Sequence, residues 1–217
     1  LINCMSCGNE ILFQAFASNL LRTSTDFWPN RPETHGEHLA VNAFVGFFFG
    51  EFIHHDWDMF QSGHAMGAFH AAGRAVSGGP VYVSDKPGQQ NFDLLRKLVL
   101  PDGSILRAQR PGVPSRDCLM ADPRESGLLK VTNVNLVGGV LGIFNRSDQE
   151  GREGTFSPSD IEDLDGDVVA IYGHQSGEVV RVERDAKIAI GLPPLGWEII
   201  TVVPLDANGF APLGLAD

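Results

Sequence analysis

The segment that most constrains the fold of this chain is residues 54–88. Its middle, 64–75, consists mainly of small and apolar residues, which indicates a closely packed helix. The Gly-Gly-Pro sequence at 78–80 ends that helix. The β-favouring run 80–83 predicts a short strand, which the turn residues 86–88 close. A strand, a crossover helix and a second strand form the repeating unit of a parallel α/β barrel.

Carboxylates follow both strands of this unit. Asp56 and Asp58 flank Trp57. In an extended segment, residues two apart point to the same face, so we expect these two carboxylates to project together, with the indole turned away. Asp85 follows the next strand. Acidic residues at the carboxyl ends of strands are where a barrel enzyme holds its chemistry.

The rest of the first hundred residues continues this alternation of strands and helices. Apolar periodicity and breaker residues predict further elements: a strand at 1–5, a helix at 10–21, a strand end in 22–29, a polar loop at 30–37, and helices at 38–48 and 91–100. Asp26 is therefore another carboxylate at a junction between a strand and a loop.

Beyond a turn at 101–103 the pattern changes to short alternating runs separated by Gly, Asp, Asn and Pro. This spacing is typical of antiparallel strands and favours a β-sandwich. The runs are SILRAQ, LLKVTNVNL, GGVLGIFNR, DVVAIYGHQ, EVVRVER, AKIAIGL and WEIITVVPL. We therefore expect residues 1–100 to hold half of a (β/α)8 TIM barrel and residues 101–217 to form an incomplete sandwich domain, in a fragment cut at both ends.

Composition excludes some classes of function. A net charge of −11 argues against non-specific nucleic-acid binding, which needs a basic face. The most apolar run, VNAFVGFFFGEF, is shorter than a membrane span. The three cysteines do not form a disulfide framework, and the pair Cys4 and Cys7 has no second pair to complete a zinc ribbon. Reduced thiols favour a cytoplasmic protein.

A cluster of histidines near Asp56 suggests a metal-dependent hydrolase as one alternative. However, His64 and His70 are six residues apart rather than three or four, and the sequence contains no H-E-x-x-H motif. We therefore expect no metal and no other cofactor. Arg74 and Lys86 are expected to be structural ion-pair partners.

Five strings in this order resemble one family, the raffinose synthase and alkaline α-galactosidase group of glycoside hydrolase family 36, also called seed-imbibition proteins. These strings are DWDMFQSGH, FHAAGRAVSGGPVYVSDKPG, LVLPDGSILRA, PGVPSRDCL and SPSDI. The resemblance implies the second half of the catalytic barrel followed by the C-terminal β-sandwich. It also implies that the first half of the barrel precedes Leu1.

The resemblance implies a retaining mechanism, in which two carboxyl groups stand about 5–5.5 Å apart. The family's nucleophile follows a Lys-x-Asp string, which this chain lacks, so we expect the nucleophile to lie outside it. The acid/base is expected near Arg22, where relatives have Arg-x-Ser-Asp-Asp-Phe. Thr25 stands in place of the first Asp, and a Thr hydroxyl cannot act as a general acid near neutral pH. We therefore assign the acid/base role to Asp26, which also matches the Arg-x-x-x-Asp spacing of family 27 enzymes.

The resemblance further implies a set of sugar-binding residues at the strand ends. These are Arg22, Trp28, Asp56, Asp58 and Asp85. Each has a structural alternative: Asp26 as a cap, Asp56 and Asp58 as acceptors of backbone N–H groups, and Asp85 as a turn former. Trp57 is expected to pack inside rather than to stack on a sugar.

The expected function is hydrolysis of α-galactosides of the raffinose type by an enzyme of which this chain is a fragment, inactive alone. One alternative is a galactosyltransferase that moves galactose from galactinol to sucrose. A second, motivated by Thr25, is a non-catalytic carbohydrate-binding relative. The expected partners are an oligosaccharide and the N-terminal half of the same enzyme.

Overall fold

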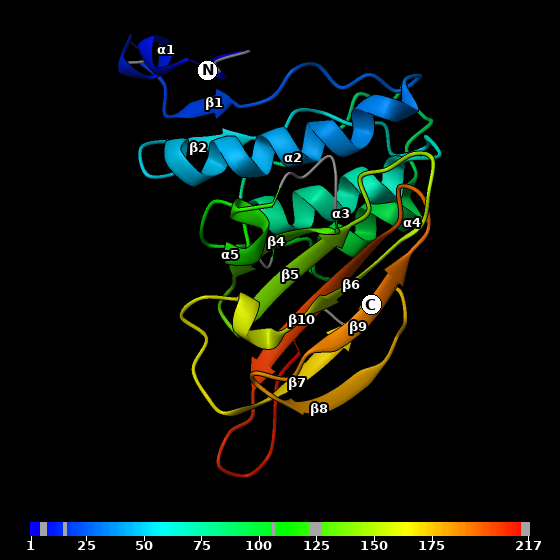
Figure 1. Cartoon of the computed structure of the whole chain (residues 1–217). Helices are drawn as coiled ribbons and strands as arrows, with labels where there is room; N and C mark the ends of the chain where they lie inside the picture. The colour runs from blue at the N-terminus through cyan, green and yellow to red at the C-terminus, as the bar shows by residue number, and fades with distance from the viewer. Residues whose placement is uncertain (5–7, 15–16, 106, 122–126, 214–217) are drawn as a thin grey trace.

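A helical layer with a short parallel sheet covers one end of a larger antiparallel sheet (Figure 1). This computed structural model describes residues 1–217 except 5–7, 15–16, 106, 122–126 and 214–217. Its helices are α1 (Asn9–Gln14), α2 (Pro32–Phe49), α3 (Gly67–Ser77), α4 (Phe92–Leu95), η1 (Arg96–Leu98), α5 (Arg116–Leu119) and η2 (Pro158–Asp160). Its strands are β1 (Leu20–Arg22), β2 (His54–Asp56), β3 (Val113–Pro114), β4 (Leu129–Val134), β5 (Gly139–Phe144), β6 (Arg152–Phe156), β7 (Val168–Gly173), β8 (Val179–Glu183), β9 (Ile188–Leu192) and β10 (Trp197–Pro204).

The parallel part begins with β1 and β2, which pair in a register that places Arg22 opposite Asp56. Isolated parallel bridges extend the arrangement on both sides, from Asn3 to Leu21 and from Phe60 to Val83. The segments that follow these strands therefore leave from the same edge of the sheet.

The antiparallel part is a six-stranded sheet in the order β3-β4-β5-β10-β7-β8, with a separate pair formed by β6 and β9. Side chains that alternate along β5 and β10 belong to two different cores. One core joins the sheet to α2 and α3: Leu39, Ala40, Ala43, Trp57, Phe69, Ala72, Val76, Leu129, Val131, Val140, Phe144 and Ile199. The other joins it to β6 and β9: Leu141, Ile143, Phe156, Ile161, Leu164, Val169, Ile171, Leu192, Ile200 and Val202. All of β5 is buried because both faces of the sheet are covered.

Several predicted elements are confirmed. The helix predicted at 64–75 is α3, and the alternating runs from 128 onward contain β4, β5, β7, β8, β9 and β10. The chain is thus a mixed α/β part joined to an antiparallel sheet. Within the described residues, no helix has the length and apolarity needed to cross a membrane.

Other predictions were wrong at particular places. The helix predicted at 10–21 ends at Gln14, and its last apolar residues belong to β1, where pairing with β2 buries Leu21. The loop predicted at 30–37 is helical from Pro32 onward, since proline suits the first turn of a helix. The described residues of the run 104–109 form no strand, and β6 was not predicted because its sequence, REGTF, carries charged and glycine residues.

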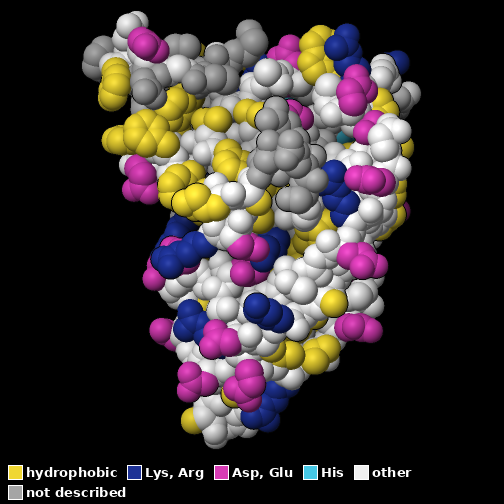
Figure 2. Space-filling view, in the orientation of Figure 1, with side chains coloured by type: hydrophobic (Ala, Val, Ile, Leu, Met, Phe, Trp, Pro, Cys, Tyr) yellow, Lys and Arg dark blue, Asp and Glu magenta, His cyan; other side chains and the backbone are white. Residues whose placement is uncertain are grey.

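The surface differs between the two ends of the molecule (Figure 2). Charged side chains of both signs are scattered over the antiparallel part, whereas apolar side chains gather near the C-terminal end of α2. Phe47, Phe48 and Phe52 are exposed there.

The end of α3 provides a test of the fold. Gly78 has φ +73°, and a Cβ at this position would collide with the carbonyl oxygen of Arg110. Gly103 has φ +85° with open space around it. Gly103→Ala should therefore cost only the strain of a left-handed residue, about 1–2 kcal/mol, while Gly78→Ala should cost about 1–3 kcal/mol more through overpacking. Equal losses in the free energy of unfolding, measured by urea denaturation, would contradict the close contact with Arg110.

Candidate active site

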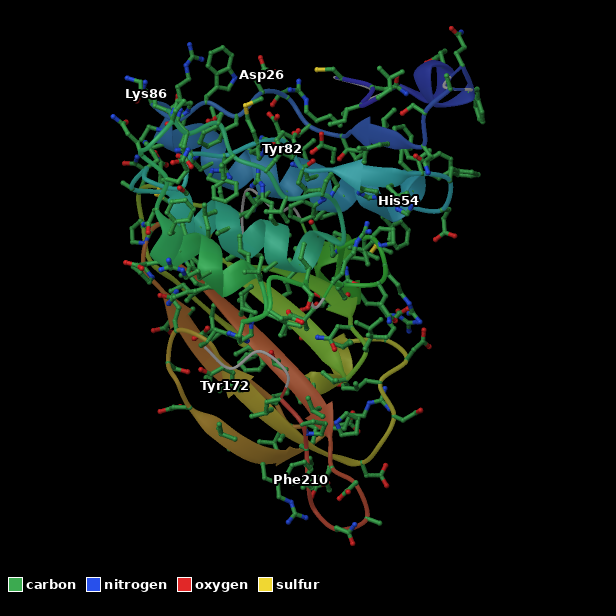
Figure 3. All side chains as sticks on the ribbon, turned by 180° about the vertical axis from the view of Figure 1, so that it is seen from behind. Asp26, His54, Tyr82, Lys86, Tyr172 and Phe210 are labelled. Atoms are coloured by element: carbon green, nitrogen blue, oxygen red, sulfur yellow. The ribbon has the colours of Figure 1, made fainter. Side chains whose placement is uncertain are left out.

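The predicted site residues lie at the carboxyl ends of the parallel strands. Arg22 ends β1 and Asp56 ends β2, while Asp85 follows the bridge at Val83. Figure 3 shows Asp26 and Tyr82 at the same end of the molecule, far from Tyr172 and Phe210 in the antiparallel part. The topology therefore brings together side chains that are up to about sixty residues apart in the sequence.

Arg22 is the centre of this arrangement. Its buried guanidinium places Nη2 2.7 Å from Oδ1 of Asp26 and Nη1 3.4 Å from Oδ1 of Asp58. Burial opposes the charge of Arg22, but the carboxylates of Asp58 and Asp26 outweigh it and raise its pKa. Arg22 thus stays positive and links a buried carboxylate to Asp26, whose side chain is 51% exposed.

Asp58 is buried and its two carboxylate oxygens already accept protein hydrogen bonds. Oδ2 accepts the backbone N–H of Phe27 at 2.9 Å, and Oδ1 accepts that of Met59 at 2.9 Å. Asp58 has φ +68°, so the extended geometry predicted for the Asp-Trp-Asp segment was wrong at this residue.

Asp56 is also buried and hydrogen bonded. Its Oδ1 accepts the N–H of Asp58 at 2.9 Å, and its Oδ2 accepts the hydroxyl of Tyr82 at 2.7 Å. Burial raises the pKa of Asp56, although these two hydrogen bonds act in the opposite direction. Burial, together with the bond to Asp56, raises the pKa of Tyr82. Tyr82 therefore remains a neutral donor.

Asp85 connects the loop after β2 to the start of α4. Its oxygens accept the N–H of Ser62 at 2.8 Å and the hydroxyl of Ser62 at 2.6 Å. The Ser62 oxygen in turn accepts the N–H of Asn91 at 2.8 Å. Asp85 is half-buried, and its bonds to Ser62 hold the loop after β2 in place.

The two tryptophans near the candidate site, Trp28 and Trp57, have different environments. Trp57 is fully buried in the core shared with α2 and α3, as expected for a side chain turned away from the carboxylates. Trp28 is 46% exposed, and the guanidinium carbon of Arg31 lies 5.1 Å from its ring centroid. Of these two indoles, the one at Trp28 has surface available for a ligand.

A network of buried histidines and Arg74 lies behind these residues. Arg74 Nη1 is 2.8 Å from Nδ1 of His70, and Nε2 of His70 is 2.7 Å from Nδ1 of His35. Arg74 forms no ion pair with a described carboxylate, so its predicted role as an ion-pair partner was wrong. In the part of the chain that the structure describes, no group of three or more His, Cys, Asp and Glu side chains is arranged to hold a metal ion.

Sequence reasoning missed the hydroxyl of Tyr82 and the hydrogen bonds that join His35, His70 and Arg74. Tyr82 lies in the β-favouring run 80–83, which forms only one isolated bridge, so nothing in the pattern marked its side chain as facing Asp56. The four-residue spacing of His70 and Arg74 on one helix face was the available signal.

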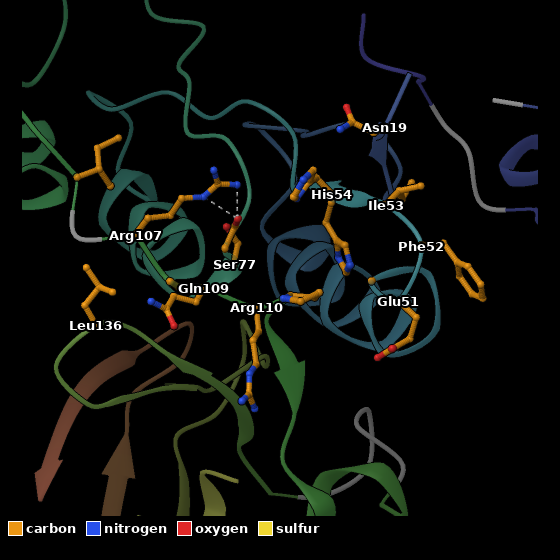
Figure 4. A pocket seen from close by; sticks show the side chains of 16 residues that line it. Asn19, Glu51, Phe52, Ile53, His54, Ser77, Arg107, Gln109, Arg110 and Leu136 are labelled. Carbon is orange, nitrogen blue, oxygen red and sulfur yellow. Dashed lines mark hydrogen bonds between the residues drawn. The ribbon is translucent and has the colours of Figure 1, made fainter. Parts of the chain in front are cut away.

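A cavity of about 620 Å³ lies at the opposite end of β2 (Figure 4). It is lined by residues that include His54, His55, Arg107 and Arg110, and by none of the predicted site residues. The candidate site is instead built around Asp26 on the loop that follows β1, because that is where the carboxylates and the buried arginine converge.

Comparison with known proteins identifies the relatives of this chain. Residues 1–151 match the family described as "Raffinose synthase or seed imbibition protein Sip1". The galactinol–sucrose galactosyltransferase of Oryza sativa subsp. japonica is 41% identical over 97% of this chain and 32% of its own length. The protein of the same name from Pisum sativum is 39% identical, again over 97% of this chain and 32% of its own length. The chain thus spans about a third of the length of these curated relatives.

The fold resembles that of solved structures. The crystal structure of a candidate α-galactosidase from Bacteroides fragilis matches with a TM-score of 0.64 and 15% sequence identity, over 93% of this chain and 46% of that chain. At this identity the match is a likeness of fold.

Burial of His55 predicts a pH dependence of stability. Burial lowers the pKa of His55 to about 4, and neither ring nitrogen has a hydrogen-bond partner among the described residues. Between pH 6.5 and 4 the unfolded chain binds the proton and the folded chain does not, so stability falls as the pH falls. From pH 7 to pH 5 this histidine should cost about 2 kcal/mol.

Replacing His55 by leucine removes the titrating group and breaks no hydrogen bond to a described residue. His55→Leu should lose less stability than the unchanged protein between pH 7 and pH 5, measured by urea unfolding at each pH. His54→Leu, at the exposed neighbouring position, is the matched control. It should change the slope much less, because the charge of His54 is only the second cause, after burial, of the lowered pKa of His55. Identical slopes for the two variants would show that His55 does not titrate in this range.

Proposed function

Because this chain belongs to the raffinose synthase or seed imbibition protein family, we propose that the protein carrying it is an enzyme that cleaves an α-galactosidic bond and passes the galactosyl group to a sugar. The names of the relatives support a sugar acceptor over water, in contrast to the hydrolase expected from the sequence. The proposed donor is a galactinol-type galactoside and the proposed acceptor is sucrose or a similar sugar.

The observation that carries this proposal is the contact of Asp26 with Arg22. A carboxylate that donates and recovers a proton must reach the substrate, and Asp26 is half exposed at the carboxyl end of a parallel strand. The 2.7 Å ion pair fixes its direction. Asp56 and Asp58 are buried and engaged by protein donors, so we propose that they support the site rather than contact the sugar.

We propose a retaining mechanism. An Asp nucleophile, placed in the part of the enzyme outside this chain, attacks the anomeric carbon while Asp26 protonates the leaving oxygen. Asp26 then takes the proton from the acceptor hydroxyl as that oxygen attacks the galactosyl-enzyme. Trp28 covers the apolar face of a sugar ring beside this carboxylate.

The proposed architecture is half of a (β/α)8 barrel in residues 1–100, followed by a β-sandwich domain in residues 101–217. The parallel pairing of β1 with β2 and the bridges at Asn3 and Val83 support the first part. The packing of β6 and β9 on the six-stranded sheet supports the second.

A non-catalytic sugar-binding protein is the second candidate, because Thr25 replaces the first of two acidic residues expected from the family pattern. Thr25 is exposed and lies outside the ion pair of Arg22 with Asp26.

Replacing Asp26 in the full-length protein tests the acid/base role. Asp26→Ala should lower turnover of an aryl α-galactoside by about 100-fold or more, because the galactosyl-enzyme forms but lacks a base to resolve it. Azide needs no base and should restore turnover, giving a galactosyl azide of retained configuration, detected by NMR.

The matched control for this experiment is Asp93→Ala. Asp93 is a fully exposed carboxylate that also pairs with an arginine, Arg96, at 3.4 Å. It should keep full activity. If Asp26→Ala is as active as this control without azide, another group supplies the proton; if the unmutated protein binds galactosides without turnover, the sugar-binding candidate is correct.

The choice of acceptor is tested by product analysis. Incubation of the full-length protein with galactinol and sucrose should give a galactosyl-sucrose trisaccharide, quantified by anion-exchange chromatography. Free galactose as the sole product, at the same rate with and without sucrose, would identify a hydrolase instead.

A further inference from the structure

Arg74 is a buried charge that contacts a run of backbone carbonyls as well as the side chains of His70 and His38. It is 1% exposed on α3. Its Nη2 donates to the carbonyl oxygen of Trp57 at 2.6 Å and to those of Asp58 and Met59 at 3.2 Å each. Its Nε also reaches the Asp58 carbonyl, at 3.3 Å. A buried charge is costly, and no described carboxylate lies within ion-pair distance of this one. These bonds stabilise it, together with the more distant charges of Asp58 and Asp56.

The three carbonyls belong to residues 57–59, a segment with strained backbone that is called the turn at Asp58 below. Asp58 has φ +68°, a conformation that is uncommon for residues other than glycine and persists only where the surroundings hold it. The planar fork of the Arg74 guanidinium contacts the carbonyls before, at and after Asp58. A single cationic side chain therefore holds the turn from its inner side.

The turn at Asp58 determines where Asp26 lies. In this conformation the Asp58 carboxylate accepts the N–H of Phe27 at 2.9 Å and faces Arg22 at 3.4 Å. Phe27 is the residue next to Asp26, and Arg22 forms the ion pair with Asp26. Both ends of the short segment that carries Asp26 are thus fixed by the carboxylate of Asp58.

Neutral histidines orient Arg74. Because Nη1 of Arg74 donates to Nδ1 of His70, the proton of His70 must be on Nε2, where it is donated to His35. Burial first, and Arg74 second, lower the pKa of His70 well below its usual value. Burial also lowers the pKa of Arg74, to about 10, which leaves it protonated at neutral pH. Arg74 is therefore a cation whose N–H groups donate to neutral His70 and to backbone carbonyls.

We infer that Arg74 is a positioning residue of the candidate active site, which holds the left-handed turn at Asp58 and through it the acid/base carboxylate of Asp26. This inference rests on the proposed function for its effect on catalysis. Its structural part, the dependence of the turn on Arg74, stands apart from any activity.

The test compares Arg74→Ala with Val76→Ala in the full-length protein. Val76 is fully buried on the same helix, in the core between α2, α3 and the sheet, so its truncation matches the loss of packing without removing a hydrogen bond to the turn. Crystal structures of both variants should show the Asp58 turn and the Phe27–Asp58 hydrogen bond changed in Arg74→Ala and unchanged in Val76→Ala. An unchanged turn in Arg74→Ala would overturn the inference.

Kinetics with a galactinol donor provide the second measurement. The leaving group of this donor requires protonation, so displacement of Asp26 should lower kcat by about 100-fold in Arg74→Ala, with a much smaller change in KM. Millimolar methylguanidinium, which fits the space left by the side chain, should restore part of kcat in Arg74→Ala and have no effect on Val76→Ala. Equal kcat values for the two variants would also overturn the inference.

Arg74→Lys covers the case in which Arg74→Ala does not fold. Lysine keeps the charge but has one nitrogen, which can replace Nη2 at the carbonyls or Nη1 at His70 but not both. A kcat for Arg74→Lys equal to that of the unmutated protein would refute the need for the fork, and a loss of about tenfold or more supports it. If the unmutated protein transfers no galactose, the proposed function fails, and the crystal structures still decide whether Arg74 holds the turn.

Discussion

The parallel pairing of β1 with β2 is the constraint on which the candidate site depends. Its register sets Arg22 opposite Asp56, so the two strands end level and their following loops leave from the same edge. With this register the loop after β1 donates the N–H of Phe27 to the carboxylate of Asp58, and Asp26 lies half exposed on the same loop. Leu21 and Trp57, both fully buried, anchor the strand ends from beneath.

Two buried arginines divide the work of supporting this edge. Arg22 forms ion pairs with the buried Asp58 and the half-exposed Asp26. Arg74 instead donates to backbone carbonyls and holds the backbone around Asp58. Asp56 and Asp58 are buried, and protein donors engage both carboxylate oxygens of each residue. Asp26 accepts from Arg22 through Oδ1, but its side chain remains half exposed.

Much of this arrangement could be predicted from the sequence, and the failures have physical causes. The glycine-rich helix, the strands of the antiparallel sheet and the strand-end positions of Asp26, Asp56 and Asp85 follow from breaker residues and periodicity. The left-handed turn at Asp58 could not be predicted, because it depends on a side chain sixteen residues away. Leu20 and Leu21 fit a helical period, and only tertiary pairing with β2 places them in a strand.

The contacts around Thr25 show more about the effect of this replacement than the family's residue pattern does. Arg22 reaches across three residues to Asp26, and Thr25 is exposed beside this ion pair. An aspartate at position 25 would place a second carboxylate next to Asp26, the proposed acid/base, and two like charges at short range oppose the ionisation of one of them. With threonine there, the ion pairs of Arg22 within the described residues are those with Asp26 and Asp58. A residue pattern that first suggests a lost catalytic group is therefore compatible with a single, well-held acid/base at Asp26.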